Sequence, residues 1–458
     1  MRSRFDFKES RKERQRRFVS HAIVFIFVLS LIEGPLRKWF LPEFASAFIF
    51  LRDPFVLSIY GYCFARDLFP KDNLFRVWMI FAIASSMIGT LVYLVVHPSA
   101  IGWALGVRSY WLYMPLAFIV ASCFTTKDLK RFVSIVLAIS LPYAVLISMQ
   151  YRAGPEAFIN AGVGADSEAA VLLVGDLVRP LGLFRFTAPN VQFTEICASV
   201  LQNSVISRAT LNLNRILVLL GLISIPVMTV LTGSRLIYFI LSGVIVTVFV
   251  GSILAPQQKR SLNSIVSILA IFGVSSFALL AVFPDMAEAM LVRLENAERS
   301  EGSIWNRAMS TLVAIYKPIH DGALFGYGIG AGASGVALYL GYPALIFGEN
   351  EFERTMNELG IVLGLGFVLL RWGTLVVVFR RLVLARGSLA TGGFAMLGFS
   401  SISFGAGQIT HSPMIGFLPW LSLGLALAIA KQAKQGLSRT QRRVFVNYAQ
   451  PERRGQTL

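Results

Sequence analysis

Residues 349–378 read ENEFERTMNELGIVLGLGFVLLRWGTLVVV, a charged segment that runs directly into an apolar helix. The apolar part, Met356 to Val378, is long enough to cross the hydrocarbon core of a bilayer as an α-helix. The polar groups before it form two neighbouring helical stripes, one with Glu349, Glu353 and Asn357 and the other with Asn350, Arg354 and Glu358. Charges at this depth are costly unless they are paired or face a cavity. The stretch therefore predicts either local ion pairs around Arg354 or a half-buried carboxylate that acts as a base.

The same apolar pattern recurs along the whole chain. Its 458 residues are 55% hydrophobic and only 15% charged, with a mean hydropathy of +0.66. This balance excludes an ordinary water-soluble protein and predicts an all-α polytopic membrane protein, a single membrane domain over residues 1–458. About twelve spans are predicted, at residues 19–32, 45–65, 77–96, 103–124, 132–151, 191–206, 216–232, 235–254, 265–283, 356–378, 389–408 and 415–430.

The positive charge predicts the orientation of these spans. The net charge is +17, and the two tails supply much of it: residues 1–17 carry eight Lys/Arg against three acids, and residues 431–458 carry seven against one. Every second connection is also short and basic. The positive-inside rule then places both tails in the cytoplasm and the long loops 152–190 and 284–355 outside. No nucleic-acid-binding motif accompanies the charge, so a nucleic-acid partner is not expected.

Two arginines outside the predicted helix interiors could bind an anion. Arg307 follows Ile304 and Trp305 in a segment that reads as a short amphipathic helix. It is either an arginine on the solvent-facing side of this helix or a guanidinium that binds phosphate near the lipid headgroups. Arg235 ends the tight turn Thr232-Gly233-Ser234-Arg235 between two apolar helices. It is either a snorkelling arginine at a helix end or part of an anion site.

The remaining polar features have simpler interpretations. The run Gly326, Gly328, Gly330 and Gly332 follows no strand and precedes no Gly-Lys-Ser/Thr, so it predicts a flexible loop whose backbone approaches a partner. Charged groups within predicted spans or just after the first span are expected to form structural ion pairs between helices; they are Glu33, Arg37, Arg52, Asp53 and Arg108. No pair of histidines has metal-ligand spacing, and the three cysteines fall in predicted spans as buried thiols.

Four segments together resemble the bacterial O-antigen ligase/polymerase family of membrane proteins. They are Arg179-Pro-Leu-Gly-Leu-Phe with Pro189-Asn190, Thr232-Gly-Ser-Arg235, Arg307 with Pro318 and Phe325-Gly-Tyr-Gly-Ile-Gly330, and Asn350 with Glu358-Leu-Gly360 and Gly364. The stretch Glu33-Gly-Pro-Leu-Arg-Lys-Trp39 with Arg52-Asp-Pro54 resembles the subset associated with exopolysaccharide production. One departure is that ligases of this family carry a histidine where this chain has Glu349.

The resemblance implies a GT-C-like glycosyltransferase of the bacterial inner membrane, with its active site on the periplasmic side. Its donor and acceptor would be polyprenyl-diphosphate-linked oligosaccharides, handled without cofactor or metal and with inversion. Membrane lipids, a flippase and a chain-length regulator are the implied partners. Negative charge would develop on the leaving diphosphate, where arginines stabilise it.

The resemblance also distributes roles among residues. The implied catalytic residues are Arg235, Arg307 and the base Glu349. The implied substrate-binding residues are Arg179, Asn350, Glu353, Arg354, Glu358 and Gly328, with Glu353 and Glu358 as further candidates for the base. The departure at Glu349 favours a polymerase of lipid-linked repeat units over a ligase that transfers glycan to a lipid core. A transporter of lipid or polysaccharide remains as an alternative of another class.

Overall fold

The structure is a computed structural model that describes residues 2–96, 100–162, 172–174, 177–254, 324–332, 350–385 and 387–448, with scattered positions between 273 and 313. Its α-helices are α1 (Arg2–Pro35), α2 (Asp53–Ala65), α3 (Asn73–Val96), α4 (Ala100–Trp111), α5 (Met114–Cys123), α6 (Thr126–Arg152), α8 (Thr187–Leu211), α9 (Arg215–Leu231), α10 (Arg235–Leu254), α15 (Glu351–Ala385), α16 (Ser388–Gly405) and α17 (Pro413–Tyr448). Short elements join them: a π-helix η1 (Leu36–Phe40), the 3₁₀ segments η2 (Pro42–Phe44), η3 (Ala47–Phe50) and η4 (Phe158–Asn160), and a hairpin of β1 (Leu172–Val174) and β2 (Leu177–Val178).

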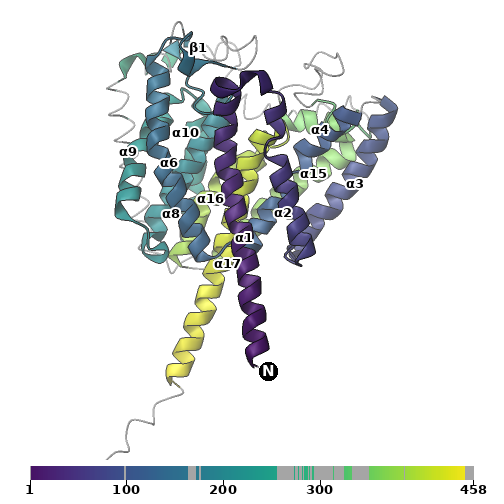
Figure 1. The fold of residues 1–458 in the computed structure, drawn as a ribbon, viewed down its shortest axis with the longest axis vertical. Coiled ribbons are helices and arrows are strands. Elements are labelled where there is room, and N and C mark those ends of the chain that lie inside the picture. The colour runs from purple at the N-terminus through teal and green to yellow at the C-terminus, as the bar shows by residue number, and fades with distance from the viewer. Residues whose placement is uncertain are drawn as a thin grey trace, which may run out of the picture.

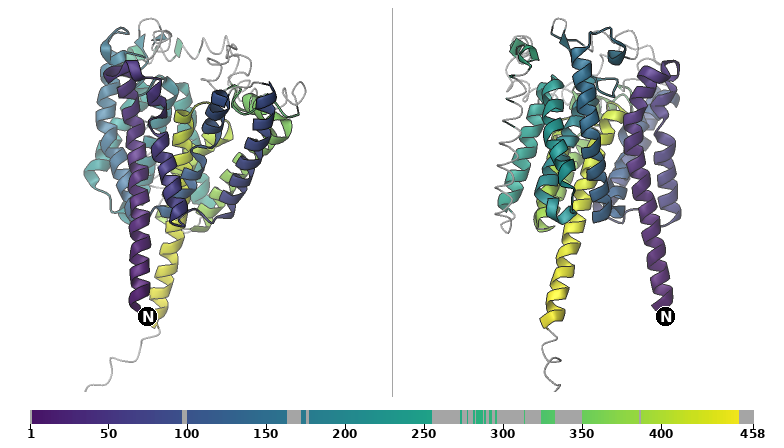
Figure 2. Two further views of the ribbon diagram at one scale, coloured as in Figure 1. Left: turned by 45° about the vertical axis from the view of Figure 1, so that its right-hand side comes forward. Right: turned by 60° about the vertical axis from the view of Figure 1, so that its left-hand side comes forward.

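The helices form one elongated bundle, and both terminal helices extend beyond it at the same end (Figure 1). The first turns of α1 and the last turns of α17 project from that end in every view (Figure 2). We call it the tail end. The opposite end, the loop end, carries η1 to η3, the β-hairpin and the N-terminus of α15 (Figure 1). The start of the first described helix and the end of the last thus lie on one side of the bundle, and the predicted orientation of the spans stays a prediction.

Eight helices among the described residues are long and apolar enough to cross a membrane, as an all-α membrane protein requires. Three further helices, α8, α9 and α16, run within the same bundle (Figure 1). The predicted span at residues 265–283 lies outside the described residues, so the count of twelve stays a prediction.

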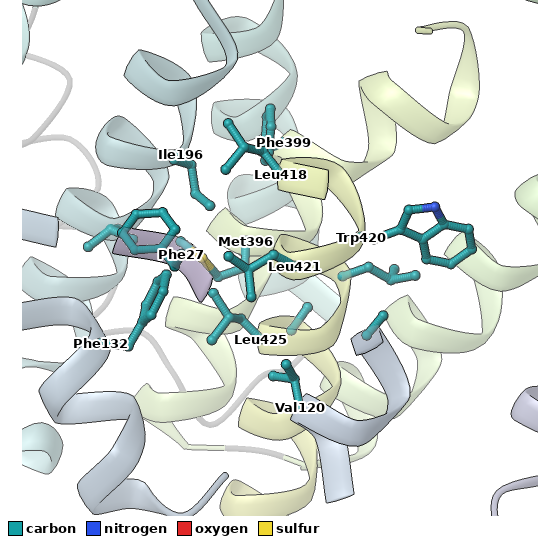
Figure 3. Close-up of a cluster of buried hydrophobic side chains, with 14 of the residues drawn as sticks. Phe27, Val120, Phe132, Ile196, Met396, Phe399, Leu418, Trp420, Leu421 and Leu425 are labelled. Carbon is teal, nitrogen blue, oxygen red and sulfur yellow. The ribbon is translucent and has the colours of Figure 1, made fainter. Parts of the chain in front are cut away.

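Helix α17 forms the centre of the bundle. In its most apolar 18-residue stretch, 89% of α17 is buried, against 28% of the corresponding stretch of α3 at the periphery. Side chains from α1, α5, α6, α8 and α16 pack around it, including Phe27, Val120 and Phe132 (Figure 3). By contrast, α3 exposes an apolar stripe at helical spacing, with Ile80, Met87 and Leu91 each more than half exposed. That stripe is the surface that lipid would cover.

Two predicted spans are interrupted where proline begins a new helix. The span predicted at 45–65 starts with 3₁₀ turns, and α2 begins only at Asp53 with Pro54 in its first turn. The span predicted at 103–124 divides into α4 and α5, with Pro115 in the first turn of α5. Proline is favoured there because the first turn of a helix leaves its N–H groups unbonded.

Helix α15 is a helical hairpin, which corrects the prediction that its charged segment runs straight into the span. Gly360 adopts φ 77° and ψ 174°, outside the helical region. In a straight helix Glu351 and Arg371 would lie about 30 Å apart, yet Arg371 Nη1 lies 3.6 Å from Glu351 Oε1. The rings of Phe352 and Trp372 also pack with centroids 6.1 Å apart. Residues 351–359 therefore fold back along the span that begins after Gly360.

Candidate functional site

The structure brings together the first two of the four segments that carry the resemblance. Arg179 follows the β-hairpin, and its Nε donates a hydrogen bond of 3.3 Å to the carbonyl oxygen of Thr232. Thr232 directly follows the end of α9 and Arg235 begins α10, so the turn between these helices lies against Arg179. The Arg235 side chain lies outside the described residues.

The third and fourth segments also meet. Gly326, Gly328 and Gly330 all have positive φ, between 69° and 99°, which lets the glycine loop coil tightly against the hairpin of α15. Tyr327 N donates to the Asn357 carbonyl at 2.7 Å, and Gly328 N donates to the Glu358 carbonyl at 3.0 Å. The partner that the glycine loop approaches is therefore the chain's own helical hairpin.

Glu358 fastens the glycine loop through its carboxylate. Its oxygens accept hydrogen bonds from Gly330 N at 3.2 Å and Gly332 N at 2.9 Å. Arg354 Nε lies 3.6 Å from the same carboxylate, one helical turn away. Glu358 is fully buried, and Tyr110 of α4 lies beside it. The predicted pairing of Arg354 with Glu358 is confirmed, and this carboxylate holds the loop in place.

Glu351 is the centre of a second set of bonds, and we call the two sets around Glu358 and Glu351 the hairpin network. Its Oε1 accepts hydrogen bonds from Ile409 N at 3.1 Å, Thr410 N at 3.0 Å and Thr410 Oγ1 at 2.9 Å. Its Oε2 accepts from Arg354 Nη2 at 2.8 Å. Arg354 Nη2 also bonds the Thr410 hydroxyl. The carboxylate thus joins the hairpin of α15 to the turn between α16 and α17.

Arg371 places a second guanidinium in this network from within the span. It donates to the carbonyl oxygens of Phe404, Ser403 and Gly407, at 2.9, 2.8 and 2.7 Å. These carbonyls lie at the C-terminal end of α16, where the helix dipole favours a cation. Glu351 and Arg371 both have fully buried side chains. Each charge therefore has an opposite charge nearby in a place that water does not reach.

His411 completes the network at the α16–α17 turn. Its Nδ1 lies 2.7 Å from Arg354 Nη1, which always carries hydrogens, so Nδ1 is the acceptor and lacks a proton. Burial of the ring, together with the positive charge of Arg354, lowers the pKa of His411 below its ordinary value. The ring is therefore neutral at pH 7, with its proton on Nε2.

The predicted site residues fall into three groups. Glu349 and Arg307 lie outside the described residues, as does the side chain of Arg235. Arg179, Arg354, Glu358 and Gly328 make the contacts given above. Asn350 precedes α15 and its Oδ1 accepts from Phe352 N at 2.9 Å, so it caps the hairpin. Glu353 is partly buried on the same helix.

Sequence reasoning missed Glu351, Arg371, Thr410 and His411 as members of the network. Arg371 carried a usable signal, since a charge in the middle of an apolar span is costly and needs a partner. Glu351 lies between the two predicted stripes, and its partners are 58 and 59 residues further along the chain. Only the fold-back at Gly360 brings these groups together.

The network is balanced in charge, and its guanidinium nitrogens are hydrogen-bonded except for Arg354 Nε and Arg371 Nη1, which each lie 3.6 Å from a carboxylate oxygen. Two carboxylates face two guanidiniums, and Glu351 and Glu358 each accept bonds from two backbone N–H groups. Such an arrangement can hold the glycine loop and the α16–α17 turn in fixed positions. Among the described residues, no three His, Cys, Asp or Glu side chains are placed to hold a metal ion.

The ion pairs predicted within the N-terminal spans are confirmed. Arg52 Nε lies 2.7 Å from Glu33 Oε2, and Arg37 Nη1 lies 3.3 Å from Glu33 Oε1. Arg108 forms a fork with both carboxylate oxygens of Asp53, at 2.5 and 3.1 Å. These pairs join α1, α2 and α4 near the loop end.

No protein-family model matches the chain, and no curated protein matches its sequence.

Proposed function

We propose that this protein is a membrane-embedded polymerase that joins lipid-linked oligosaccharide repeat units in the biosynthesis of a cell-surface polysaccharide. The observation that carries the proposal is the pairing of motif segments at the loop end. Arg179 bonds the Thr232 carbonyl, and the glycine loop bonds Asn357 and Glu358. Arg179, Thr232, the glycine loop and Glu358 belong to segments that carry the family resemblance, and Asn357 directly precedes Glu358.

The proposed reaction is a single displacement at the anomeric carbon of the donor. An acceptor hydroxyl oxygen attacks that carbon, and the bond from the carbon to the diphosphate oxygen breaks with inversion. The hydroxyl proton passes to the carboxylate of Glu349, and the electron pair leaves with the lipid diphosphate. Arg235 and Arg307 stabilise the charge on the leaving group, because preformed guanidinium donors are most effective in a water-poor site.

The buried network supports this reaction by fixing the positions of the hairpin start and of the glycine loop. Residue 349 directly precedes the cap residue Asn350, and Glu351 anchors the start of the hairpin to the α16–α17 turn. Both Glu358 oxygens accept bonds from the glycine loop, so Glu358 is better suited to hold that loop than to accept a proton. This leaves Glu349 as the preferred base and makes Arg354 a positioning residue.

A reconstitution tests the proposal directly. The purified protein in nanodiscs receives an oligosaccharide diphosphate-lipid from its own host, with and without a lipid-core acceptor, and products are resolved on a gel. A ladder without added acceptor identifies a polymerase. A single shifted band that requires the lipid core identifies a ligase. An unchanged, authenticated donor with folded protein would contradict both enzymes and favour transport.

The arginine roles are tested by conservative substitution. Arg235→Lys and Arg307→Lys keep the charge and lose the planar fork, so each is expected to lower the polymerisation rate about 100-fold. Arg381→Lys serves as the matched control, because Arg381 pairs with Asp72 at the tail end. Equal rates for all three variants would rule out bidentate phosphate recognition by Arg235 and Arg307.

A further inference from the structure

A second buried cluster, at the loop end of α1, has an excess of positive charge. Glu33 pairs with Arg37 and Arg52, and Arg185 lies close enough to Arg37 for their charges to interact. Lys38 follows Arg37 and bonds the loop that carries Arg185. Glu33, Arg37, Lys38 and Arg52 are each at most 9% exposed, and Arg185 is partly buried. With four cations and one carboxylate, the set carries a net charge of +3. Buried charge of one sign is costly unless an opposite charge is supplied.

The loop that carries Arg185 is fixed against α1. A Cβ at Gly34 would lie 1.5 Å from the Leu183 carbonyl oxygen, so the two backbones are in direct contact. Lys38 Nζ donates to the Gly182 carbonyl at 3.3 Å, and Gln150 Oε1 accepts from Gly182 N at 2.8 Å. The loop therefore holds Arg185 close to Arg37, where their charges act on each other.

Glu33 neutralises only part of the positive charge of this cluster and accepts hydrogen bonds from only two of its guanidinium groups. Each of its oxygens takes one guanidinium nitrogen, Nη1 of Arg37 and Nε of Arg52. Three buried guanidinium nitrogens then have no hydrogen-bond partner among the described residues: Arg37 Nε, Arg52 Nη1 and Arg185 Nε. The Arg52 guanidinium stacks between the rings of Tyr113 and Phe417, each 5.5 Å away, and the Tyr113 hydroxyl is also unpartnered.

The neighbouring ion pair of Asp53 and Arg108 is balanced in charge and hydrogen-bonded through both carboxylate oxygens. Arg108 donates to both oxygens of Asp53 and, through Nη2, to the Ile49 carbonyl at 2.6 Å. One cation faces one anion, and no polar atom of either side chain is left buried without a partner. In the hairpin of α15, Arg354 Nε and Arg371 Nη1 also lack a hydrogen-bond partner, but each lies 3.6 Å from a carboxylate oxygen and the charges there are balanced two to two. The surplus of positive charge therefore distinguishes the α1 cluster.

We propose that the α1 cluster, Glu33, Arg37, Lys38, Arg52 and Arg185 with Tyr113, binds the phosphate groups of a diphosphate-bearing lipid. A diphosphate supplies the charge of two or three that the cluster needs, and its oxygens suit the free guanidinium donors. A single carboxylate would leave the charge unbalanced. Phe40, Leu41 and Phe44, all beside the cluster in sequence, are 71%, 43% and 56% exposed, which offers an apolar surface for the lipid chain. The site is argued independently of the proposed glycosyl transfer.

Binding of defined probes to the purified, delipidated full-length protein tests the site. Geranylgeranyl diphosphate, inorganic pyrophosphate and geranylgeraniol separate the contributions of charge and chain. The diphosphate lipid is expected to bind most tightly, pyrophosphate at least tenfold more weakly, and the alcohol not measurably. Phosphatidylglycerol in nanodiscs carries a single charge and is expected not to compete. Equal affinity for pyrophosphate and the diphosphate lipid, or effective competition by phosphatidylglycerol, would overturn the proposed ligand class.

Substitutions locate the binding to the cluster. Arg185→Gln and Arg37→Gln each remove a guanidinium and are expected to weaken diphosphate-lipid binding about tenfold or more. Arg185 is partly exposed, so its variant is the one least expected to affect folding. Arg152→Gln is the matched control, since Arg152 is an exposed arginine at the end of α6 over the Phe283 ring. Unchanged binding in Arg185→Gln, or an equal loss in Arg152→Gln, would overturn the assignment. Because the readout is binding, it stands or falls separately from polymerase activity.

Discussion

The hairpin of α15 and the loop end of α1 both bury several charged side chains, and they differ in the balance between cations and carboxylates. In the hairpin network, Glu351 and Glu358 face Arg354 and Arg371, and the carboxylates also take backbone N–H groups. In the α1 cluster, one carboxylate faces four cations. Guanidinium nitrogens without a hydrogen bond occur in both regions, but those of the hairpin, Arg354 Nε and Arg371 Nη1, lie 3.6 Å from a carboxylate oxygen. A charge-balanced network fixes geometry, whereas one with surplus charge has a place for a ligand of opposite charge. The comparison assigns a structural role to the first region and a binding role to the second.

The largest expected effect comes from breaking the hairpin network. Glu351→Gln leaves Arg354 and Arg371 as buried charges with less compensation, which costs about 3–5 kcal/mol of unfolding free energy. Unfolding in mixed micelles titrated with sodium dodecyl sulfate measures this loss. Lys71→Ala is the control, because its pair with Asp67 is 71% exposed on both sides and is expected to leave the midpoint unchanged. A Glu351→Gln protein as stable as the wild type would remove the distinction between the two regions.

The second prediction concerns the fold-back that creates the hairpin network. At Gly360 the backbone conformation is one that only glycine adopts readily, and a Cβ there would lie 2.2 Å from the Leu324 carbonyl oxygen. Gly360→Ala is therefore expected to cost about 2–4 kcal/mol in the same assay. Gly373→Ala lies in the same helix with open space around its Cβ and is expected to be neutral or slightly stabilising. Equal stability of the two variants would argue for a straight α15.

The smallest effect is a pH dependence that His411 gives to the hairpin network. The pKa of His411 is lowered by burial and by the charge of Arg354, so the unfolded chain binds the proton more readily than the folded one. The contribution to stability is complete above the ordinary histidine pKa of about 6.5 and declines as the pH falls below it. The thermal midpoint between pH 5 and pH 8 measures this decline. His411→Gln should flatten it, and an identical slope in the variant would exclude His411 as the titrating group.

The fold class could be predicted from the sequence because membrane solvation imposes simple rules. Apolar runs of helix length predicted an all-α membrane protein, and eight described helices are long and apolar enough to span a bilayer. The count of twelve spans and the cytoplasmic placement of both tails, which rests on the distribution of Lys and Arg, stay predictions. The ion pairs of Glu33 with Arg52 and of Asp53 with Arg108 were also expected, since isolated charges within spans are unfavourable. These inferences depend on the cost of burial alone, which is a property of the residue type.

The details of the hairpin network could not be inferred in the same way. Gly360 lies in a segment whose apolar pattern continues on its far side, and glycine is common within membrane helices, so nothing local marks a reversal. The partners of Glu351 are backbone groups of Ile409 and Thr410, and a sequence pattern does not show which distant backbone groups meet. The excess charge at the loop end of α1 was similarly hidden, because Arg185 joins it from a loop about 150 residues away.

The fold-back at Gly360 also sets an order of events during synthesis. Residues 351–359 contain four charged side chains, Glu351, Glu353, Arg354 and Glu358, and such a segment does not enter lipid by itself. The backbone N–H groups that donate hydrogen bonds to Glu351 lie on the turn between α16 and α17, which leaves the ribosome later. The hairpin can therefore dock only after both C-terminal helices have inserted. A chain that stops before the α16–α17 turn would reach the membrane with Glu351, at the start of the hairpin, without these backbone partners. The hairpin therefore reaches its final position only when nearly the whole chain has been made.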